Sequence, residues 1–252
     1  MKSLFSDNKV IYFPSLESTN NYASELIRKD LPEEGTIIFT DHQTKGKGQR
    51  GNKWESEENK NLTFSIVIYP DFLSLDYSFL ISEITSISII NLIKPMVDEV
   101  KIKWPNDIIV KSEKMAGILV ENSILHDKIS TCIVGIGINI NQSSFPENAP
   151  AATSLGLLTK REYKIRKLLT RFLLFFEKWY MKLKEAQYTL IQEEYYKHFD
   201  KLGEYQLFED ENGQFSGKIT GVDKKGFLIV EKENKELKKY AFKQINFLDL
   251  QK

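Results

Sequence analysis

Apolar and polar positions follow two different periods along the chain, which predicts a mixed α/β fold. From residue 62 to residue 69, Leu, Phe and Ile alternate with Thr, Ser, Val and Tyr, the two-residue period of a strand with two distinct faces. Shorter apolar runs predict strands over residues 10–13 and 36–40, and Ser18 or Thr19 is placed to cap a helix between them. The predicted strands therefore frame the polar segment that follows residue 40.

The longest apolar stretch, residues 79–97, predicts a core helix. Leu80, Ile84 and Ile87 recur at helical spacing. Glu83 and several other polar residues interrupt the stretch, so it falls short of the roughly 18 uninterrupted apolar residues that a membrane span needs. We therefore expect no membrane association.

Further strands and one long helix complete the predicted main domain. Three strands are expected over residues 100–103, 115–121 and 131–140, and residues 141–152 form an irregular connection. From residue 160 to residue 184 the apolar positions lie near helical spacing, which predicts an amphipathic helix that closes the core.

Beyond Gly203 the pattern changes to short β-like runs. Asn212-Gly213 and Lys225-Gly226 separate these runs with the turn chemistry of hairpins. The runs cover residues 205–208, 215–222, 227–230 and 240–242. We expect a larger domain over residues 1–200 and a small β-barrel module over residues 201–252.

Composition narrows the class of protein. The 252 residues are 41% hydrophobic and 28% charged, typical of a globular protein. Lys+Arg and Asp+Glu both number 35, so no global field favours nucleic acid or an anionic membrane. The single Cys132 excludes a disulfide framework and fits a reducing compartment, and residues 1–10 lack the apolar core of a signal peptide. We expect a cytoplasmic protein.

The first candidate for chemistry is the basic glycine loop Gly46-Lys47-Gly48-Gln49-Arg50-Gly51. Its glycines permit positive φ and let backbone N–H groups turn toward an anion, while the two cations supply charge for phosphate oxygens. The loop has neither the ending of a P-loop nor Rossmann spacing, and a plain surface turn remains the alternative. Trp54, just beyond it, offers a stacking face for a purine or a lid over a ligand, or is a core residue.

The second candidate is the segment Lys103-Trp104-Pro105-Asn106-Asp107. It ends a predicted strand and presents Asn106 and Asp107 at the mouth of that strand. Lys114 is expected on the return turn, where a lysine near an amide and a carboxylate can neutralise a transferring phosphate or carboxylate; a solvated surface lysine is the alternative. Together the two segments predict a site that activates a carboxylate with a nucleotide.

Five motifs in order give the chain a specific resemblance. They are Ser18-Thr19-Asn20, Gln43 with the glycine loop and Trp54, K-W-P-N-D at 103–107, K-M-A-G-I-L-V-E at 114–121 and G-I-G-I-N at 135–139. In these motifs, over about residues 10–140, the chain resembles the biotin protein ligases. The resemblance implies an α+β fold, with a mixed β-sheet packed with helices like that of class II synthetases, and a small C-terminal β-barrel similar to Src-homology-3 domains.

The same resemblance implies a two-step reaction. The carboxylate of biotin attacks the α-phosphate of ATP, with magnesium ions offsetting phosphate charge, and gives biotinyl-adenylate and pyrophosphate. A lysine of a biotin carboxyl carrier protein then attacks the mixed anhydride. This chemistry needs positioning and electrostatic stabilisation more than an enzyme nucleophile.

Site residues implied by the resemblance fall into four overlapping groups. Those implied for catalysis are Lys114, Arg50 and Asp107, the last to orient the incoming lysine. Those implied for biotin are Ser18, Thr19, Asn20, Gln43, Gly46, Lys47, Lys114 and Gly117. Those implied for ATP are Lys47, Gln49, Arg50, Trp54, Asn106, Lys114 and Asn139. Asn106 and Asn139 are also implied to face the metal.

One departure and several alternatives accompany the resemblance. The family commonly has arginine where this chain has Lys47 and Gln49, so one charge is missing near the phosphates, and we expect weaker adenylate retention or a replacement charge elsewhere.

Only 17 residues precede Ser18, too few for the DNA-binding domain that some relatives carry, so direct DNA binding is not expected. A lipoate or octanoate ligase of the same fold and a non-catalytic biotin- or nucleotide-binding module are the rival functions. The sequence leaves a monomer and a homodimer open.

Overall fold

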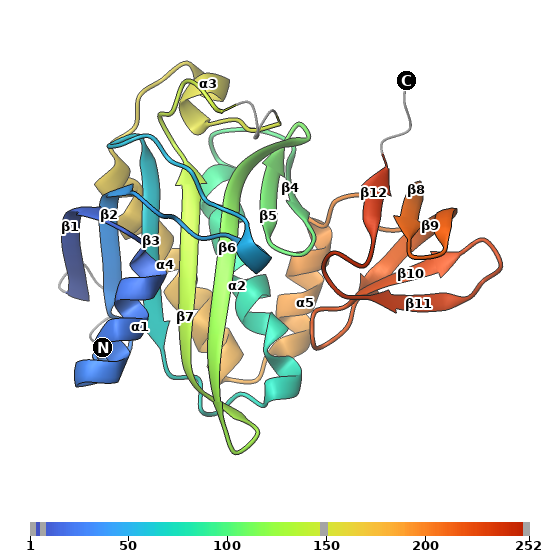
Figure 1. Ribbon diagram of the computed structural model, residues 1–252, viewed down its shortest axis with the longest axis horizontal. Coiled ribbons are helices and arrows are strands. Elements are labelled where there is room, and N and C mark those ends of the chain that lie inside the picture. Colours follow the sequence, from blue (N-terminus) through green and yellow to red (C-terminus); the bar gives the residue numbers. More distant parts are fainter. Residues whose placement is uncertain (1–3, 6–8, 147–150, 249–252) are drawn as a thin grey trace.

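A seven-stranded sheet and a smaller five-stranded sheet lie side by side in the computed structural model (Figure 1). The structure describes residues 4–5, 9–146 and 151–248. Within these ranges the side chain of Arg50 lies outside what is described.

The large sheet has the strand order β1-β2-β3-β7-β6-β5-β4. β1 and β2 pair in parallel, and every other neighbouring pair is antiparallel. Its strands are β1 (Val10–Leu16), β2 (Ile37–Gln43), β3 (Asn61–Ile68), β4 (Val100–Lys103), β5 (Asp107–Val110), β6 (Glu113–Leu125) and β7 (Lys128–Asn139). The predicted mixed sheet is confirmed, and β5 is a strand that sequence reasoning missed.

Both faces of the central strand β3 are buried along its whole length. Leu62 and Phe64 on one face belong to the main hydrophobic core, whereas Val67 on the other face packs in a second cluster that includes Ala23 of the helix α1 (Thr19–Asp30). The two faces predicted from the alternation are confirmed, and helices cover both of them.

The helices form a layer on each side of the large sheet. α1 begins after Ser18, whose Oγ accepts from the backbone N–H of Asn21, and it lies on the front face in Figure 1. The opposite face is covered by α2 (Phe79–Ile93) and α4 (Ile165–Lys184), and α5 (Tyr188–Lys197) packs against both of these helices.

Two helical segments differ from the prediction. The helix expected from residue 160 begins at Ile165, because a separate short helix, α3 (Leu155–Thr159), ends at Lys160 in a left-handed conformation with φ of 55°. α5 was not predicted, since only Ile191 and Tyr195 of its ten residues are buried and its apolar pattern is correspondingly weak.

The segment Leu75–Ile93, which includes α2, is long and apolar enough by length and composition to cross a membrane. In the fold, however, 67% of its most apolar window is buried. Buried residues occur all round α2, as expected for the central helix of a globular core. The prediction of a core helix is confirmed.

The small sheet is antiparallel, with the order β11-β10-β9-β8-β12. Its strands are β8 (Tyr205–Asp210), β9 (Gly213–Val222), β10 (Leu228–Lys232), β11 (Leu237–Tyr240) and β12 (Asn246–Leu248). One turn ends at Asn212, just before β9 begins at Gly213, and another reaches Gly226, so both predicted turns are found. β11 ends where the last strand was expected to begin, and β12 was missed. The arrangement is consistent with an SH3-like module, although the described residues show no pairing of β11 with β12 that would close a barrel.

Candidate active site

A floor of glycine backbone lies at the centre of the large sheet, under the indole of Trp54. Gly117 of β6 pairs with Gly137 of β7. A Cβ at Gly137 would lie 2.3 Å from Cε2 of Trp54, and one at Gly117 would lie 3.1 Å from its Cζ3. Any larger residue at Gly137 would therefore displace the indole. The Nε1 of Trp54 is buried and has no hydrogen-bond partner among the described residues, so a ligand acceptor there would relieve an unsatisfied donor.

The segment that carries Trp54 crosses in front of β7 and β6 (Figure 1). The backbone N–H of Trp54 donates to the carbonyl of Gly46 over 3.0 Å, and Lys47 and Lys53 form an isolated antiparallel bridge. A Cβ at Gly46 would lie 2.2 Å from the carbonyl oxygen of Trp54, so only glycine fits this close approach. The glycine loop is thus a compact strap rather than a free surface turn.

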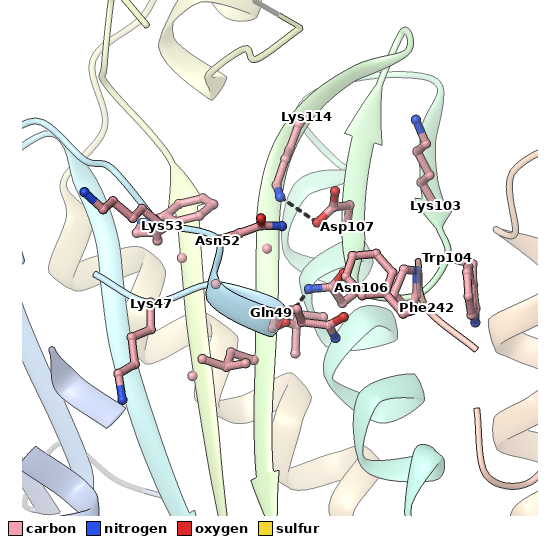
Figure 2. Close-up of a pocket in the computed structure, with 18 of the residues that line it drawn as sticks. Lys47, Gln49, Asn52, Lys53, Lys103, Trp104, Asn106, Asp107, Lys114 and Phe242 are labelled. Carbon is pink, nitrogen blue, oxygen red and sulfur yellow. Dashed lines mark hydrogen bonds and ion pairs between the residues drawn. The ribbon is translucent and has the colours of Figure 1, made fainter. Parts of the chain in front are cut away.

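The strap, the glycine floor and the small sheet enclose a first cavity of about 570 Å³. Of the predicted residues it is lined by Thr19, Gln43, Lys47, Gln49, Trp54, Asn106, Asp107, Lys114 and Gly117. Most of these residues lie on strands of the large sheet or on the strap. Figure 2 shows Gln49 of the strap beside Asn106. Residues far apart in the sequence therefore converge as predicted.

An ion pair stands on the wall of this cavity. Nζ of Lys114 lies 2.7 Å from Oδ1 of Asp107, and Figure 2 shows the two side chains pointing toward one another. Lys114 is the second residue of β6, so its expected place on the return turn is wrong. The turn lies at Lys111 and Ser112, both in left-handed conformations, because β5 continues from Asp107 to Val110.

A second cavity of about 800 Å³ adjoins the first. Trp54, Asp107 and Lys114 line both cavities, so the ion pair and the indole lie at the boundary between them. Asn139 lines only the second cavity, with Phe145, Pro146, Ala151 and Ala152. Both volumes lie within the range of small-molecule sites.

Four predicted residues do not line the first cavity. The hydroxyl of Ser18 caps α1, and Gly46, the first residue of the strap, is buried against the backbone of Trp54. Asn20 is buried behind Thr19, where its Nδ2 donates to Glu121 over 2.7 Å. Asn139 faces the second cavity. Arg50, predicted for catalysis and for phosphate binding, is the residue whose side chain lies outside the description.

The two asparagines implied for metal binding lie in different cavities. Nδ2 of Asn106 donates to the carbonyl of Ile118 over 2.6 Å, so its oxygen is the atom it can offer to a ligand. Nδ2 of Asn139 donates to the carbonyl of Thr153 over 3.0 Å. The described residues contain no group of three or more His, Cys, Asp or Glu suited to a metal ion. The metal role of Asn106 and Asn139 stays a prediction.

Sequence reasoning missed two kinds of cavity residue. Lys53 and Lys103 line both cavities and add positive charge that the glycine loop alone lacks, and each stands beside a tryptophan already singled out. Phe242, Asn246 and Phe247 come from the small sheet or the loop before β12. Nothing in their local sequence signals this position, because it arises when the two sheets pack together.

Taken together, the glycine floor, the basic strap and the Lys114–Asp107 pair at the junction of two cavities define a class of site. It is suited to holding a small carboxylic acid and a nucleotide with their reactive ends together, next to a fixed positive charge.

Comparison with known proteins agrees with this class. Residues 12–139 match the biotin/lipoate A/B protein ligase family, and residues 207–242 match the biotin protein ligase C terminal domain. The chain belongs to the biotin/lipoate A/B protein ligase family. The bifunctional ligase/repressor BirA of Bacillus subtilis is 31% identical over 243 residues, covering 95% of this chain and 74% of that protein.

Solved structures give the same result. The biotin protein ligase from Aquifex aeolicus in complex with biotin and ATP has a TM-score of 0.78 and 26% identity, and the match covers 95% of this chain and 98% of that one. The biotin protein ligase from Leishmania major in complex with biotin, at 18% identity and a TM-score of 0.60, shares the fold.

Proposed function

We propose that this protein joins biotin to a lysine of a biotin carboxyl carrier protein, using ATP and a biotinyl-adenylate intermediate. The observation that carries the proposal is the Lys114–Asp107 pair, with 2.7 Å between Nζ and Oδ1, on the wall shared by the two cavities. The similar structure of the Aquifex aeolicus biotin protein ligase, which holds both biotin and ATP, supports the choice of substrates.

Each cavity takes one substrate in this proposal. Biotin occupies the first cavity, where Thr19 and Gln43 supply polar groups at one end and the glycine floor admits a flat ring against backbone. ATP occupies the second, between Trp54 and the segment that includes Asn139. The carboxylate and the α-phosphate then meet beside Lys114.

The first step forms one bond and breaks one. A carboxylate oxygen of biotin attacks the α-phosphorus of ATP, and the bond from that phosphorus to the bridging oxygen of pyrophosphate breaks. Nζ of Lys114 stabilises the negative charge that develops on the phosphoryl oxygens. Lys53 and Lys103, which line both cavities, add positive charge near the departing pyrophosphate.

The second step transfers the biotinyl group. The neutral amine of the acceptor lysine attacks the acyl carbon, the bond to AMP breaks, and the amine loses a proton as the amide forms. Asp107 is the carboxylate nearest to this junction that the cavities offer, and we assign it the orientation of the incoming amine.

Magnesium enters with ATP in this scheme. A magnesium ion keeps several waters and commonly binds through substrate phosphates with one or two protein oxygens. Asn139 lines the cavity assigned to ATP and Asn106 lines the adjoining one, and we keep the amide oxygens of both as candidate ligands for the ion. When bound, the ion would offset phosphate charge.

Several finer statements belong to the same proposal. We place the division between the catalytic domain and the C-terminal module at residues 200 and 201. Equal numbers of acidic and basic residues support a reaction without direct DNA contact, and the use of ATP together with the buried free Cys132 supports a cytoplasmic location. The proposal is compatible with a monomer or a homodimer.

The test uses the full chain with biotin, ATP, magnesium and a biotin carboxyl carrier domain. We expect pyrophosphate release and a carrier mass increased by one biotinyl group. Release without transfer would refute this choice of carrier. Neither event from a folded protein would refute the proposed function, and activity with lipoate in place of biotin would establish the rival ligase.

A further inference from the structure

A chain of side-chain hydrogen bonds runs from the first cavity along the face of the large sheet that α1 covers, and it ends at Glu121 of β6. Oε1 of Gln43 lies 3.1 Å from Oγ1 of Thr19, which lies 2.7 Å from Oγ of Ser65. Ser65 in turn lies 2.5 Å from Oδ1 of Asn20, and Nδ2 of Asn20 lies 2.7 Å from a carboxylate oxygen of Glu121. All but Glu121 are less than a tenth exposed.

The carboxylate at one end sets the direction of every bond. Glu121 can only accept, so the amide nitrogen of Asn20 must face it and the amide oxygen must face Ser65. That oxygen can only accept, so Ser65 donates its single hydroxyl proton to Asn20. The Oγ of Ser65 is then left as an acceptor toward Thr19.

The other end of the chain is fixed by backbone. The backbone N–H of Thr19 donates to Oε1 of Gln43 over 2.8 Å, so the Nε2 of Gln43 remains as a donor. The hydroxyl proton of Thr19 has two acceptors within the protein, Ser65 and Gln43. Ser65 is the nearer acceptor, at 2.7 Å against 3.1 Å for Gln43, and with the proton held there the Thr19 oxygen presents lone pairs to a ligand.

Close packing holds the middle of the chain in place. A Cβ at Gly135 would lie 2.2 Å from Oδ1 of Asn20, so the amide fits against the backbone of β7 only because that residue is glycine. Ser65 is fully buried in β3. Neither side chain lines a cavity, so neither can touch the substrate.

We infer that Ser65, Asn20 and Glu121 are positioning residues, which keep Thr19 an acceptor toward the ligand beside Gln43, a donor that the backbone of Thr19 orients. This polar pattern fits a ring that carries N–H beside C=O, as a cyclic urea does, and offers nothing to a dithiolane. The inference rests on the proposed function, because it explains how a biotin site selects the ureido ring.

The chain of hydrogen bonds from Gln43 to Glu121, called the relay below, can be tested with the variants Ser65→Ala and Glu121→Gln. Ser65→Ala removes the nearer of the two acceptors of the Thr19 proton, which frees that proton to turn toward the ligand. In Glu121→Gln the new amide can both donate and accept, which lets the Asn20 amide turn over. We expect the KM for biotin in pyrophosphate exchange to rise about fivefold to tenfold for Ser65→Ala and about threefold for Glu121→Gln. The KM for ATP should stay within about twofold of wild type in both.

Two controls match these changes elsewhere. Ser88→Ala removes another fully buried serine hydroxyl, in α2, and Glu25→Gln removes another exposed carboxylate, in α1. Both should leave the KM for biotin unchanged. Thermal unfolding of all four variants separates positioning from a general loss of stability.

The double variant Ser65→Ala with Glu121→Gln tests the relay itself. If the two residues act through one chain of bonds, its KM should equal that of the weaker-binding single variant rather than the product of both effects. Multiplicative effects, an unchanged KM for biotin, or parallel rises in the KM for biotin and for ATP would each overturn the inference. Lack of biotin binding by the wild type in calorimetry would instead overturn the proposed function, and the inference with it.

Discussion

Replacing Lys114 by alanine is the sharpest test of the proposed chemistry. Its Nζ lies 2.7 Å from Asp107 and 5.8 Å from the centre of the Trp54 ring, at the boundary of the two cavities. A unit charge about 4 Å from a developing phosphoryl charge is worth about 4 kcal/mol at an effective dielectric constant of about 20. Because Asp107 offsets part of this field, we expect a loss of about 100-fold to 1,000-fold in adenylate formation.

Stability should change far less than activity. The side chain of Lys114 is 38% exposed and that of Asp107 is 26% exposed. A pair this accessible contributes about 1 kcal/mol or less to folding. We therefore expect Lys114→Ala to unfold within a few degrees of wild type.

Biotin-dependent exchange of pyrophosphate into ATP measures the first step alone. Lys197→Ala is the matched control, since it removes another exposed lysine whose Nζ lies 2.8 Å from a glutamate, Glu194, outside both cavities. That control should exchange at the wild-type rate. Near wild-type exchange by Lys114→Ala would refute the assignment of Lys114 to the transition state.

Three further changes test other parts of the site. Trp54→Ala removes the indole that covers Gly137 and should raise the KM for biotin and for ATP about tenfold in pyrophosphate exchange; unchanged values would exclude a lid. Gln49→Arg adds a charge at the first cavity and should slow adenylate release severalfold in a rapid-filtration assay, whereas equal rates would remove the charge argument. Burial raises the pKa of Glu83 to about 8, so between about pH 4.5 and about pH 8 the folded protein keeps a proton that the unfolded chain releases. The free energy of unfolding should therefore fall as pH rises through this range, by up to about 1.4 kcal/mol per pH unit. Urea unfolding of wild type and Glu83→Gln across this range should show the slope only in wild type.

Local patterns predicted the elements whose signal is local. The alternation over residues 62–69 and the Gly-containing turns in the C-terminal module both led to strands found in the structure. β5 escaped because it has only four residues and follows directly on the K-W-P-N-D segment, which was interpreted as the end of a strand. α5 escaped because few of its residues are buried.

The residues of the candidate site also differ in whether the local sequence signals them. Thr19, Gln43, Trp54 and Lys114 belong to motifs with fixed spacing, and the structure brings all four to one cavity. Ser65 has no such signal, because its importance comes from hydrogen bonds to residues 45 and 46 positions away in the sequence. Contacts of that kind are set by sheet register and helix packing, which a linear pattern does not specify.

The packing of the two sheets explains why the second motif serves both the fold and the site. Nε1 of Trp104 donates to the carbonyl of Gly226 over 2.9 Å, and its ring meets that of Phe242 edge to face at 6.3 Å. Asn106 and Asp107, two and three residues after Trp104, line the first cavity. The small sheet therefore holds the turn that carries Asn106 and leads into Asp107, the first residue of β5. These contacts join residues more than 100 positions apart in the sequence. The position of Asp107 opposite Lys114 therefore depends on the small sheet, although both residues belong to the large one.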